Sequence, residues 1–396
     1  YGSAALMVAP WLGRGVSLAQ DAVAKSASEL IAGKDPRLVV LKPFPAVLET
    51  PRSLLAEHGQ TPLSELFVRN NQQPEGTETM QPVPLAGWKV ELAGLVSKPQ
   101  SFDAKILTEL PSTSVEMVLQ CSGNGRSLYN AGAQTKGTQW GHGGMGCVAF
   151  EGVPLAKLLE HLQLDGDRAA RCGTAQGKDE ALAGTEDFEH SLPVDEALSR
   201  SLLALKINGQ DLPAIHGGPV RLVTPGVYGT MHIKWLSQLS FVADESRNEH
   251  HARRYRMPRS RIRPGTDFVA NLENSRFNWR MNTKSVVLQP EPGAELKAGP
   301  VTISGVAFND GAAPIDLVLV STDQGQSWHK AQLEKAAGRY AWYPWSIKTD
   351  LPRGRHVIWA RAVDALGRSQ PSNGSVRWNP SGYEWNGVES IDVTVS

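Results

Sequence analysis

The hydrophobic positions in the first two-thirds of the chain fall into both strand-like and helix-like runs. The run WKVELAGLV (88–96) predicts a strand, and HIKWLSQLSFV (232–242) supplies further buried apolar positions. The run PLAKLLEHL (154–162), with a proline in its first turn, predicts a helix, and LPVDEALSRSLLAL (192–205) predicts a second helical stretch. A mixture of this kind is typical of an α+β domain.

From about residue 284 the pattern changes to short apolar runs with turn residues between them. In IDLVLVS the apolar alternation falls on Ile315, Leu317 and Leu319, although Val318 and Val320 blur the period. Such spacing predicts an all-β sandwich of the immunoglobulin type, without the antibody disulfide because this segment has no cysteine. The runs are VTISGVAF (301–308), IDLVLVSTD (315–323), YAWYPWSIK (340–348), HVIWARAVD (356–364) and SIDVTVS (390–396).

These patterns divide the chain into four segments. Residues 1–19 resemble the remnant of an export signal, because the short apolar run AALMVAPWL is followed by SLA, a small-residue cleavage site. A basic start is missing, so the chain is expected to begin inside that signal, and a short surface helix is the alternative. Residues 20–60 are expected to form an extended or partly helical lead-in. Residues 61–283 form the α+β domain, and residues 284–396 form the all-β domain.

Length and charge exclude several classes of protein. The 396 residues are enough for two or three domains with sizeable cores. The 40 Lys and Arg residues balance 40 Asp and Glu residues, which argues against a nucleic-acid-binding protein or a polybasic membrane binder. After the first few residues, no apolar run reaches the roughly 18 residues that a membrane span needs.

The three cysteines, Cys121, Cys147 and Cys172, are too few and too widely spaced for a disulfide framework. No C-x-x-C pair occurs, which argues against a zinc ribbon, and no C-x-x-C-H occurs, so no c-type haem is attached. One cysteine that binds a metal and two that are buried would suit an oxidising compartment. Taken alone, Cys121 is more often a packed core thiol than a ligand.

Four stretches combine cations with glycines or amides. Glycine turns let a bound group approach the backbone, and arginine makes paired hydrogen bonds to oxyanions. Together the stretches favour a site for a phosphorylated cofactor and an anionic substrate. Each also has a structural interpretation: a basic run is usually a solvated face, His216 and His232 can be structural, and His250–His251 is a weak metal signal. The stretches are FVRNN (67–71), CSGNGR (121–126), HGGPVRLVTPGVYGTMHIKW (216–235) and RNEHHARRYRMPRSRIR (247–263).

The order and wording of these motifs resemble the sulfite oxidase family of molybdenum enzymes. FVRNN is followed by VLQCSGNGR, Trp140, HGGPVRLVTPGVYGTMHIKWL, RRYR and, in the all-β segment, STDQGQSW. The resemblance runs from about residue 37 to the C-terminus and is closest in kind to a bacterial periplasmic sulfite dehydrogenase. It implies a molybdopterin-binding α+β domain, an immunoglobulin-like dimerisation domain and a homodimer.

The family carries molybdenum on molybdopterin, a pyranopterin dithiolene. By resemblance Cys121 is the protein ligand of the metal, and thiolate is a soft donor that coordination keeps deprotonated. Arg221 and Lys234 are physically suited to a phosphate anion. The full set of cofactor contacts that the resemblance implies is Phe67, Val68, Arg69, Asn70, Asn71, Cys121, Asp179, His216, Arg221, His232, Ile233 and Lys234.

The resemblance also implies that sulfite is oxidised to sulfate at the metal. Arg69 and Arg126 match arginines that hold the oxyanion, Trp140 matches an aromatic wall, and Tyr255 matches the tyrosine whose hydroxyl lies beside the metal. These four residues are the expected substrate-binding set. Arg69, Arg126 and Tyr255 together with Cys121 are the expected catalytic set. The arginines would neutralise a dianion that approaches an electron-rich metal centre.

Two positions depart from the family pattern. Asn71 stands where members often have a histidine, so a neutral amide replaces a titratable ring and the pH dependence is expected to differ. Ser381 stands where vertebrate members carry a third pocket arginine. Either Arg377 or the basic segment at 247–263 compensates for that charge, or sulfite binding is weaker.

No cytochrome b5 segment and no haem motif are recognised, so a separate soluble c-type cytochrome is the expected electron acceptor. The protein is expected to be periplasmic and to be exported folded, with its cofactor, by the twin-arginine route. Two alternatives remain at this point. One is a related molybdenum oxotransferase that acts on another substrate such as a sulfoxide. The other is a non-enzymatic exported anion-binding or adhesion protein.

Overall fold

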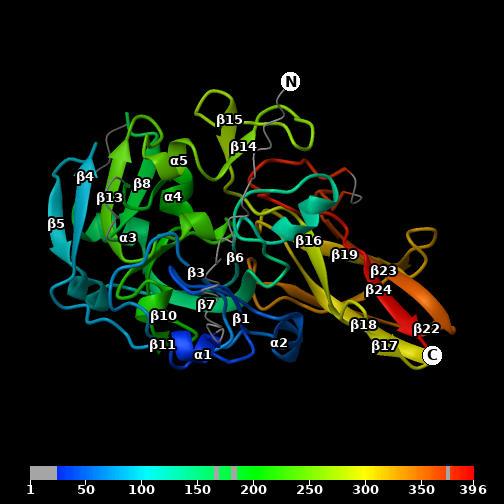
Figure 1. The fold of residues 1–396 in the computed structure, drawn as a ribbon. Helices are drawn as coiled ribbons and strands as arrows, with labels where there is room; N and C mark the ends of the chain where they lie inside the picture. Colours follow the sequence, from blue (N-terminus) through cyan, green and yellow to red (C-terminus); the bar gives the residue numbers. More distant parts are fainter. Residues whose placement is uncertain (1–24, 165–168, 180–184, 372–374) are drawn as a thin grey trace, which may run out of the picture.

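The computed structural model describes residues 25–164, 169–179, 185–371 and 375–396. A mixed α+β part is followed by a part built only of strands, and the two pack against each other along the chain (Figure 1). The predicted α+β and all-β classes are both confirmed at this level. The predicted export signal lies outside the described residues.

Two five-stranded sheets form most of the α+β part. One has the order β11-β10-β7-β6, with β12 also paired to β10, and the other has the order β5-β4-β13-β8-β9. Strands β4 and β13 run parallel, and every other pairing in these two sheets is antiparallel. Their bounds are β4 (Lys89–Gly94), β5 (Gln100–Asp103), β6 (Thr113–Gln120), β7 (Met145–Pro154), β8 (Cys172–Gly177), β9 (Glu189–Pro193), β10 (Leu202–Ile207), β11 (Gln210–Asp211), β12 (Arg221–Val223) and β13 (Leu236–Val242).

The helices of this part are short and cover the sheets. The first predicted helix is α3 (Leu155–His161) and begins directly after Pro154. The second, α4 (Val194–Arg200), is shorter than predicted, because the apolar run after it forms β10 between β7 and β12. A strand buried between two neighbours is continuously apolar, and periodicity alone does not separate it from a helix. The remaining elements here are α5 (Glu249–Ala252), η1 (Ala104–Glu109), η2 (Arg126–Ala131), η3 (Ala214–His216), η4 (Gly229–Met231), β14 (Arg256–Pro258) and β15 (Ser275–Phe277).

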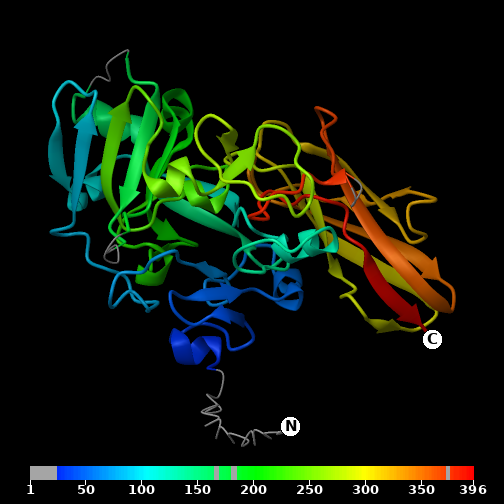
Figure 2. The ribbon, with the colours of Figure 1, turned by 45° about the horizontal axis from the view of Figure 1, so that its top comes forward.

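The lead-in segment is more structured than the sequence indicated. It contributes two helices and two strands, and the two strands form a three-stranded sheet with β3. The segment lies beneath the rest of the α+β part in Figure 2. Ile31, Leu48 and Leu54 from this segment pack with Val68 and with Ile215 of η3. This packing fixes the segment that carries the FVRNN motif against η3. The elements are α1 (Ala27–Leu30), β1 (Val39–Lys42), β2 (Val47–Glu49), α2 (Arg52–Glu57) and β3 (Val68–Arg69).

The C-terminal part is a sandwich of two sheets, with the orders β16-β18-β22-β21 and β17-β24-β23-β19-β20. Side chains from both sheets share one apolar core. That the sandwich is of the immunoglobulin type stays a prediction. The five strand-like runs all form strands. The bounds are β16 (Lys284–Gln289), β17 (Glu295–Leu296), β18 (Gly299–Phe308), β19 (Ile315–Ser321), β20 (His329–Lys330), β21 (Gln332–Leu333), β22 (Tyr343–Leu351), β23 (Gly354–Asp364) and β24 (Ile391–Val395).

One detail of β19 was predicted wrongly. Ile315 is buried as expected, but the pairing with β23 shifts register between Ile315 and Leu317. The fully buried side chains that follow are therefore Val318 and Val320, while Leu317 and Leu319 are only half-buried. A bulge inserts one residue and reverses which face the later side chains occupy.

Candidate active site

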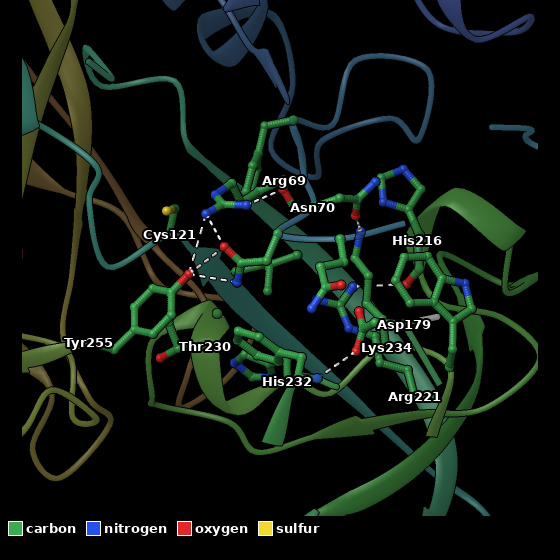
Figure 3. A pocket seen from close by; sticks show the side chains of 17 residues that line it. Arg69, Asn70, Cys121, Asp179, His216, Arg221, Thr230, His232, Lys234 and Tyr255 are labelled. Atoms are coloured by element: carbon green, nitrogen blue, oxygen red, sulfur yellow. Dashed lines mark hydrogen bonds between the residues drawn. The ribbon is translucent and has the colours of Figure 1, made fainter. Parts of the chain in front are cut away.

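A cavity lies where β3, the turn after β6, η3, η4 and the start of β13 meet (Figure 3). It contains about 690 Å³ of unfilled space, a figure that includes open solvent at its mouth. The residues that line it are Phe67, Arg69, Asn70, Asn71, Gln72, Leu119, Cys121, Asp179, Phe188, His216, Arg221, Gly229, Thr230, His232, Lys234, Trp235 and Tyr255.

Cys121 lines one end of the cavity at the point where β6 ends. Its backbone N–H donates to Gly144 O (2.8 Å), and its carbonyl accepts from Asn124 N (3.0 Å), so the turn after the strand is fixed on both sides. The residue is 8% exposed. Cys147 is fully buried in β7, where burial raises its pKa to about 12, and Cys172 is half-buried rather than buried as expected. Cys121 is therefore the one cysteine that faces the cavity.

Arg69 and Tyr255 lie beside Cys121 (Figure 3), and both are hydrogen-bonded to Asn71. The Tyr255 hydroxyl accepts from Asn71 Nδ2 (2.7 Å) and from Arg69 Nη2 (3.3 Å), and it donates to Asn71 Oδ1 (2.9 Å). Tyr255 has a φ of 54°, a left-handed conformation that costs energy for a residue with a side chain. The strained backbone at Tyr255 directs its hydroxyl toward Arg69 and Asn71.

Arg126 lies outside the cavity lining but within reach of this group. Its Nε donates to Ser381 O (2.6 Å), and its Nη1 donates to Thr138 O (2.7 Å). Nη2 has no hydrogen-bond partner among the described residues. The guanidinium lies 5.3 Å from the ring centre of Tyr383, which in turn stacks on Tyr255 at 5.3 Å. One N–H edge of Arg126 therefore remains available to an anion.

The opposite end of the cavity is cationic (Figure 3). Lys234 Nζ donates to Asn70 Oδ1 (2.6 Å) and to Ile215 O (2.7 Å), and Arg221 Nη1 donates to His216 O (3.1 Å). Gly217, at φ 98°, lies against the Lys234 side chain, where a Cβ would come within 2.7 Å of Lys234 Cβ. Only glycine permits this close approach.

Few acids offset these buried cations. Burial lowers the pKa of Arg221 to about 9, and burial together with the charge of Arg221 lowers the pKa of Lys234 well below its ordinary value. Burial lowers the pKa of His216 as well, with the charges of Lys34 and Lys234 adding to the effect. Asp179 is the acid here, and burial raises its pKa to about 7. An anionic ligand would stabilise the charged form of every one of these cations.

The cavity fits a phosphorylated cofactor that carries a thiophilic metal. The Nε of Arg221 and the hydroxyl of Thr230 are buried without a hydrogen-bond partner among the residues that the structure describes. Buried polar groups are ordinarily paired, so these atoms point to an absent ligand. A thiol lies at one end and uncompensated cations lie at the other. Soft sulfur and phosphate-binding donors are thus placed at two ends of a single cavity.

Besides Arg126, three further expected contacts do not line the cavity. Val68 and Ile233 are buried in hydrophobic clusters instead. Trp140 is fully buried with its ring 5.9 Å from that of Phe67, so it supports the cavity wall from behind rather than forming it.

His232 presents its ring to the cavity, but its nitrogens serve the fold. Thr224 N donates to Nδ1 (3.2 Å), and Nε2 donates to Val227 O (3.2 Å). Burial lowers its pKa to about 3, so the ring stays neutral. Both ring nitrogens of His232 are therefore used in structural hydrogen bonds, as the structural interpretation expected.

Neither the basic segment at 247–263 nor Arg377 supplies the third pocket arginine whose place Ser381 occupies. Among the described residues, no arginine between 247 and 263 lines the cavity. Arg377 donates to the backbone carbonyls of Pro258 and Arg259. Arg256 is buried and donates to Ser275 and Glu245. Both side chains hold the hairpin of β14 and β15 in place.

Several residues at the cavity were not among the predicted site residues. Lys34, in the lead-in, does not line the cavity but is buried against it, with a 2.8 Å contact between its Nζ and His216 Nε2. Trp235 lines the cavity and donates from Nε1 to Ala214 O (2.9 Å). An adjacency to HIK could have indicated Trp235, whereas nothing local indicates Lys34. The other unpredicted lining residues are Gln72, Leu119, Phe188, Gly229 and Thr230.

Other candidate sites are weaker. The described residues contain one group with metal-ligand geometry, Glu57, His58 and Glu65, two of which are exposed and salt-bridged to Arg37 or to each other. His250 and His251 belong to no such group. No described helix is both long and apolar enough to cross a membrane.

Comparison with known proteins agrees with the geometry. The family described as the oxidoreductase molybdopterin binding domain matches residues 79–250, and the Mo-co oxidoreductase dimerisation domain matches residues 275–394. Chicken sulfite oxidase is 31% identical over 378 residues, which cover 91% of this chain and 79% of that protein. Mouse mitochondrial sulfite oxidase is also 31% identical, and the alignment spans 89% of this chain but 64% of the mouse protein.

A solved structure is similar as well. The sulfane dehydrogenase SoxCD from Paracoccus pantotrophus superposes with a TM-score of 0.75 at 26% identity, over 89% of this chain and 85% of that one. These matches make the cofactor a molybdenum-molybdopterin. The chain belongs to the sulfite oxidase family of molybdenum enzymes.

Proposed function

We propose that this protein oxidises sulfite to sulfate at its molybdenum centre and passes the electrons to an external c-type cytochrome. The observation that carries the proposal is the convergence of Arg69, Tyr255 and, one stacked ring away, Arg126 beside the single cavity cysteine. Two guanidinium groups and a hydroxyl suit a small dianion. In the overall reaction, sulfite and water give sulfate, two protons and two electrons.

The residues have distinct roles in this proposal. Cys121 would hold the metal, and Arg221, Lys234 and His216 would hold the phosphate end of the cofactor. The bound cofactor supplies oxygen-atom transfer and accepts the electron pair. Arg69 and the free Nη2 edge of Arg126 would bind the sulfite oxygens and keep the dianion beside the metal.

On substrate binding, Tyr255 would turn its single O–H from Asn71 Oδ1 to the same place and act as a hydrogen-bond donor and proton carrier. Its partner Asn71 does not titrate, so the hydroxyl keeps the same hydrogen-bonded partner across the physiological pH range.

A related substrate is the second candidate. The similarity to the sulfane dehydrogenase SoxCD favours another reduced sulfur compound, and Ser381 in place of a third arginine leaves more room and less charge on the substrate side. A sulfoxide, acting as an oxygen donor, is the corresponding reductive alternative. Initial rates with sulfite, thiosulfate and dimethyl sulfoxide on one enzyme preparation separate the three.

We also propose an assembly and a location for the protein. The dimerisation family match supports a homodimer through the β-sandwich, which analytical ultracentrifugation of the loaded protein tests directly. Periplasmic location and twin-arginine export rest on the apolar N-terminal residues of the sequence. A full-length reading frame without an Arg-Arg pair ahead of that run would contradict this route.

The decisive experiment is an acceptor assay on molybdenum-loaded protein. With sulfite as the electron donor, a soluble c-type cytochrome should be reduced in the ratio of two per sulfite consumed. Oxygen should be reduced far more slowly. Turnover with oxygen at the same rate would overturn the cytochrome assignment, and turnover only with another sulfur compound would overturn the sulfite assignment.

A further inference from the structure

Lys34 makes three contacts that tie the lead-in to the cavity. Its Nζ lies 2.5 Å from Leu63 O, 2.8 Å from Leu66 O and 2.8 Å from His216 Nε2. Leu63 and Leu66 belong to the turn that leads into β3 and its Arg69. One buried amine therefore joins the segment on the substrate side to the histidine on the cationic side.

Two protonation patterns satisfy these contacts. An ammonium donates three hydrogen bonds, so His216 Nε2 accepts and its proton lies on Nδ1. A neutral amine donates two, so Nε2–H donates to the nitrogen lone pair and Nδ1 is left unprotonated. Burial lowers the pKa of Lys34, whereas three acceptors stabilise the ammonium.

The ligand end decides between the two patterns. His216 lines the cavity and its Nε2 is engaged by Lys34, so Nδ1 is the ring nitrogen that is left for a ligand. With the neutral amine, Nδ1 would turn a lone pair toward the oxygens of an anion, which is repulsive. With the ammonium, Nδ1 presents an N–H to that anion, beside the donors of Arg221 and Lys234 that already grip the same η3 turn.

We propose that Lys34 is a positioning residue for the cofactor: as an ammonium it holds His216 in the Nδ1–H tautomer, so that the ring donates a hydrogen bond to the cofactor phosphate. The hydrogen bond on one imidazole nitrogen sets the protonation of the other. Lys34 does not touch the cofactor in this account. It acts only through His216.

The tautomer is measured directly on the wild-type holoenzyme. Long-range proton–nitrogen NMR correlation of histidine-labelled protein distinguishes Nδ1–H from Nε2–H, and the signals of His216 are assigned by their loss in His216→Asn. We expect a protonated Nδ1 and an unprotonated Nε2. A protonated Nε2 in the wild type would overturn the proposal, whatever the variants below do.

The variants measure the consequence for the cofactor. Lys34→Met should release molybdenum and pterin during dialysis about tenfold faster, the effect of one lost charge-assisted hydrogen bond. Lys42→Met, exposed at the end of β1, is the matched control and should not change the release rate. If Lys34→Met does not fold, the wild-type NMR measurement still tests the proposal.

A double variant separates positioning from general stability. The amide of an asparagine reaches about as far as Nδ1, so His216→Asn retains a donor near the phosphate that needs no help from Lys34. In that background Lys34→Met should accelerate cofactor release only slightly. An equal acceleration in both backgrounds would show that Lys34 acts through the backbone of Leu63 and Leu66 alone, and the proposal would fail.

Discussion

Asn71 and Tyr255 bind each other through two hydrogen bonds, one from the amide Nδ2 to the hydroxyl oxygen (2.7 Å) and one from the hydroxyl to Oδ1 (2.9 Å). The pair sits beside Cys121, where sulfite is proposed to react. Because the amide does not titrate, the orientation of the hydroxyl does not depend on a proton equilibrium of its partner.

Restoring a histidine at this position should introduce that equilibrium. In Asn71→His we expect kcat/KM for sulfite to fall about tenfold as the pH drops below roughly 6.5, because a protonated ring no longer accepts from the Tyr255 hydroxyl. The neighbouring Arg69 should shift this inflection to lower pH. Steady-state pH profiles measure it, and Asn71→Gln should change the rate without a new inflection.

Gly123 tests the role of Arg126. A Cβ at this position would come within 2.6 Å of Arg126 Cζ and closer still to Nη2, so Gly123→Ala should displace the guanidinium edge that is free for substrate. We expect KM for sulfite to rise about tenfold with molybdenum content unchanged. Gly59→Ala, where nothing lies within 4 Å of the added carbon, should leave both values as in the wild type.

Cys121→Ser should abolish both molybdenum binding and sulfite oxidation, because a serine hydroxyl is a hard, weakly acidic donor. Cys172→Ser removes a half-buried thiol that does not face the cavity and should keep a full molybdenum load. Metal analysis of the purified proteins gives the answer. A full molybdenum content in Cys121→Ser would contradict the assignment of the ligand.

Lys284 is buried at the start of β16, and its Nζ lies 5.1 Å from the ring centre of Trp385 without a hydrogen-bond partner in the described part of the chain. Burial lowers its pKa to about 7, although the nearby Glu389 opposes this. The charged amine therefore costs stability below pH 7, and the cost disappears as the pH rises from about 7 to about 10.4, where the unfolded chain also loses its proton.

Lys284→Met should consequently raise the free energy of unfolding by up to about 5 kcal/mol at pH 6. The gain should vanish near pH 10. Thermal unfolding of the loaded enzyme at several pH values measures this trend, with the exposed Lys348→Met of the same sandwich as the control. A gain that grows with pH would contradict the sign of the argument.

The order of the motifs along the chain, through the family resemblance, was sufficient for much of the site. Arg69, Cys121 and His216 each had a structural interpretation when taken alone, and the structure brings them to one cavity. The strands of the sandwich were predictable from local patterns, since strand alternation is a local property. The bulge in β19 was not, because register depends on the partner strand β23.

Lys34 shows why the rest could not be predicted. It lies among residues without a motif, 182 positions before His216, and its role arises only from burial against Leu63, Leu66 and that ring. The prediction that Trp140 forms the cavity wall was wrong for the opposite reason. Trp140 lies at an expected position in the sequence, but Phe67 lies between it and the cavity. Which face of a wall a side chain occupies is decided by packing and not by sequence neighbours.

The stack of Arg126, Tyr383 and Tyr255 has a consequence for how this enzyme can be divided. Tyr383 and the Ser381 carbonyl come from the chain after β23, which runs back from the sandwich to the catalytic part. A fragment that ends near residue 250 would retain the cofactor contacts. It would lose Tyr255 and also Tyr383 and Ser381, which hold the guanidinium of Arg126. Such a fragment would be a cofactor carrier without a substrate pocket. A chimera that exchanges the C-terminal part between relatives would alter substrate affinity as well as assembly.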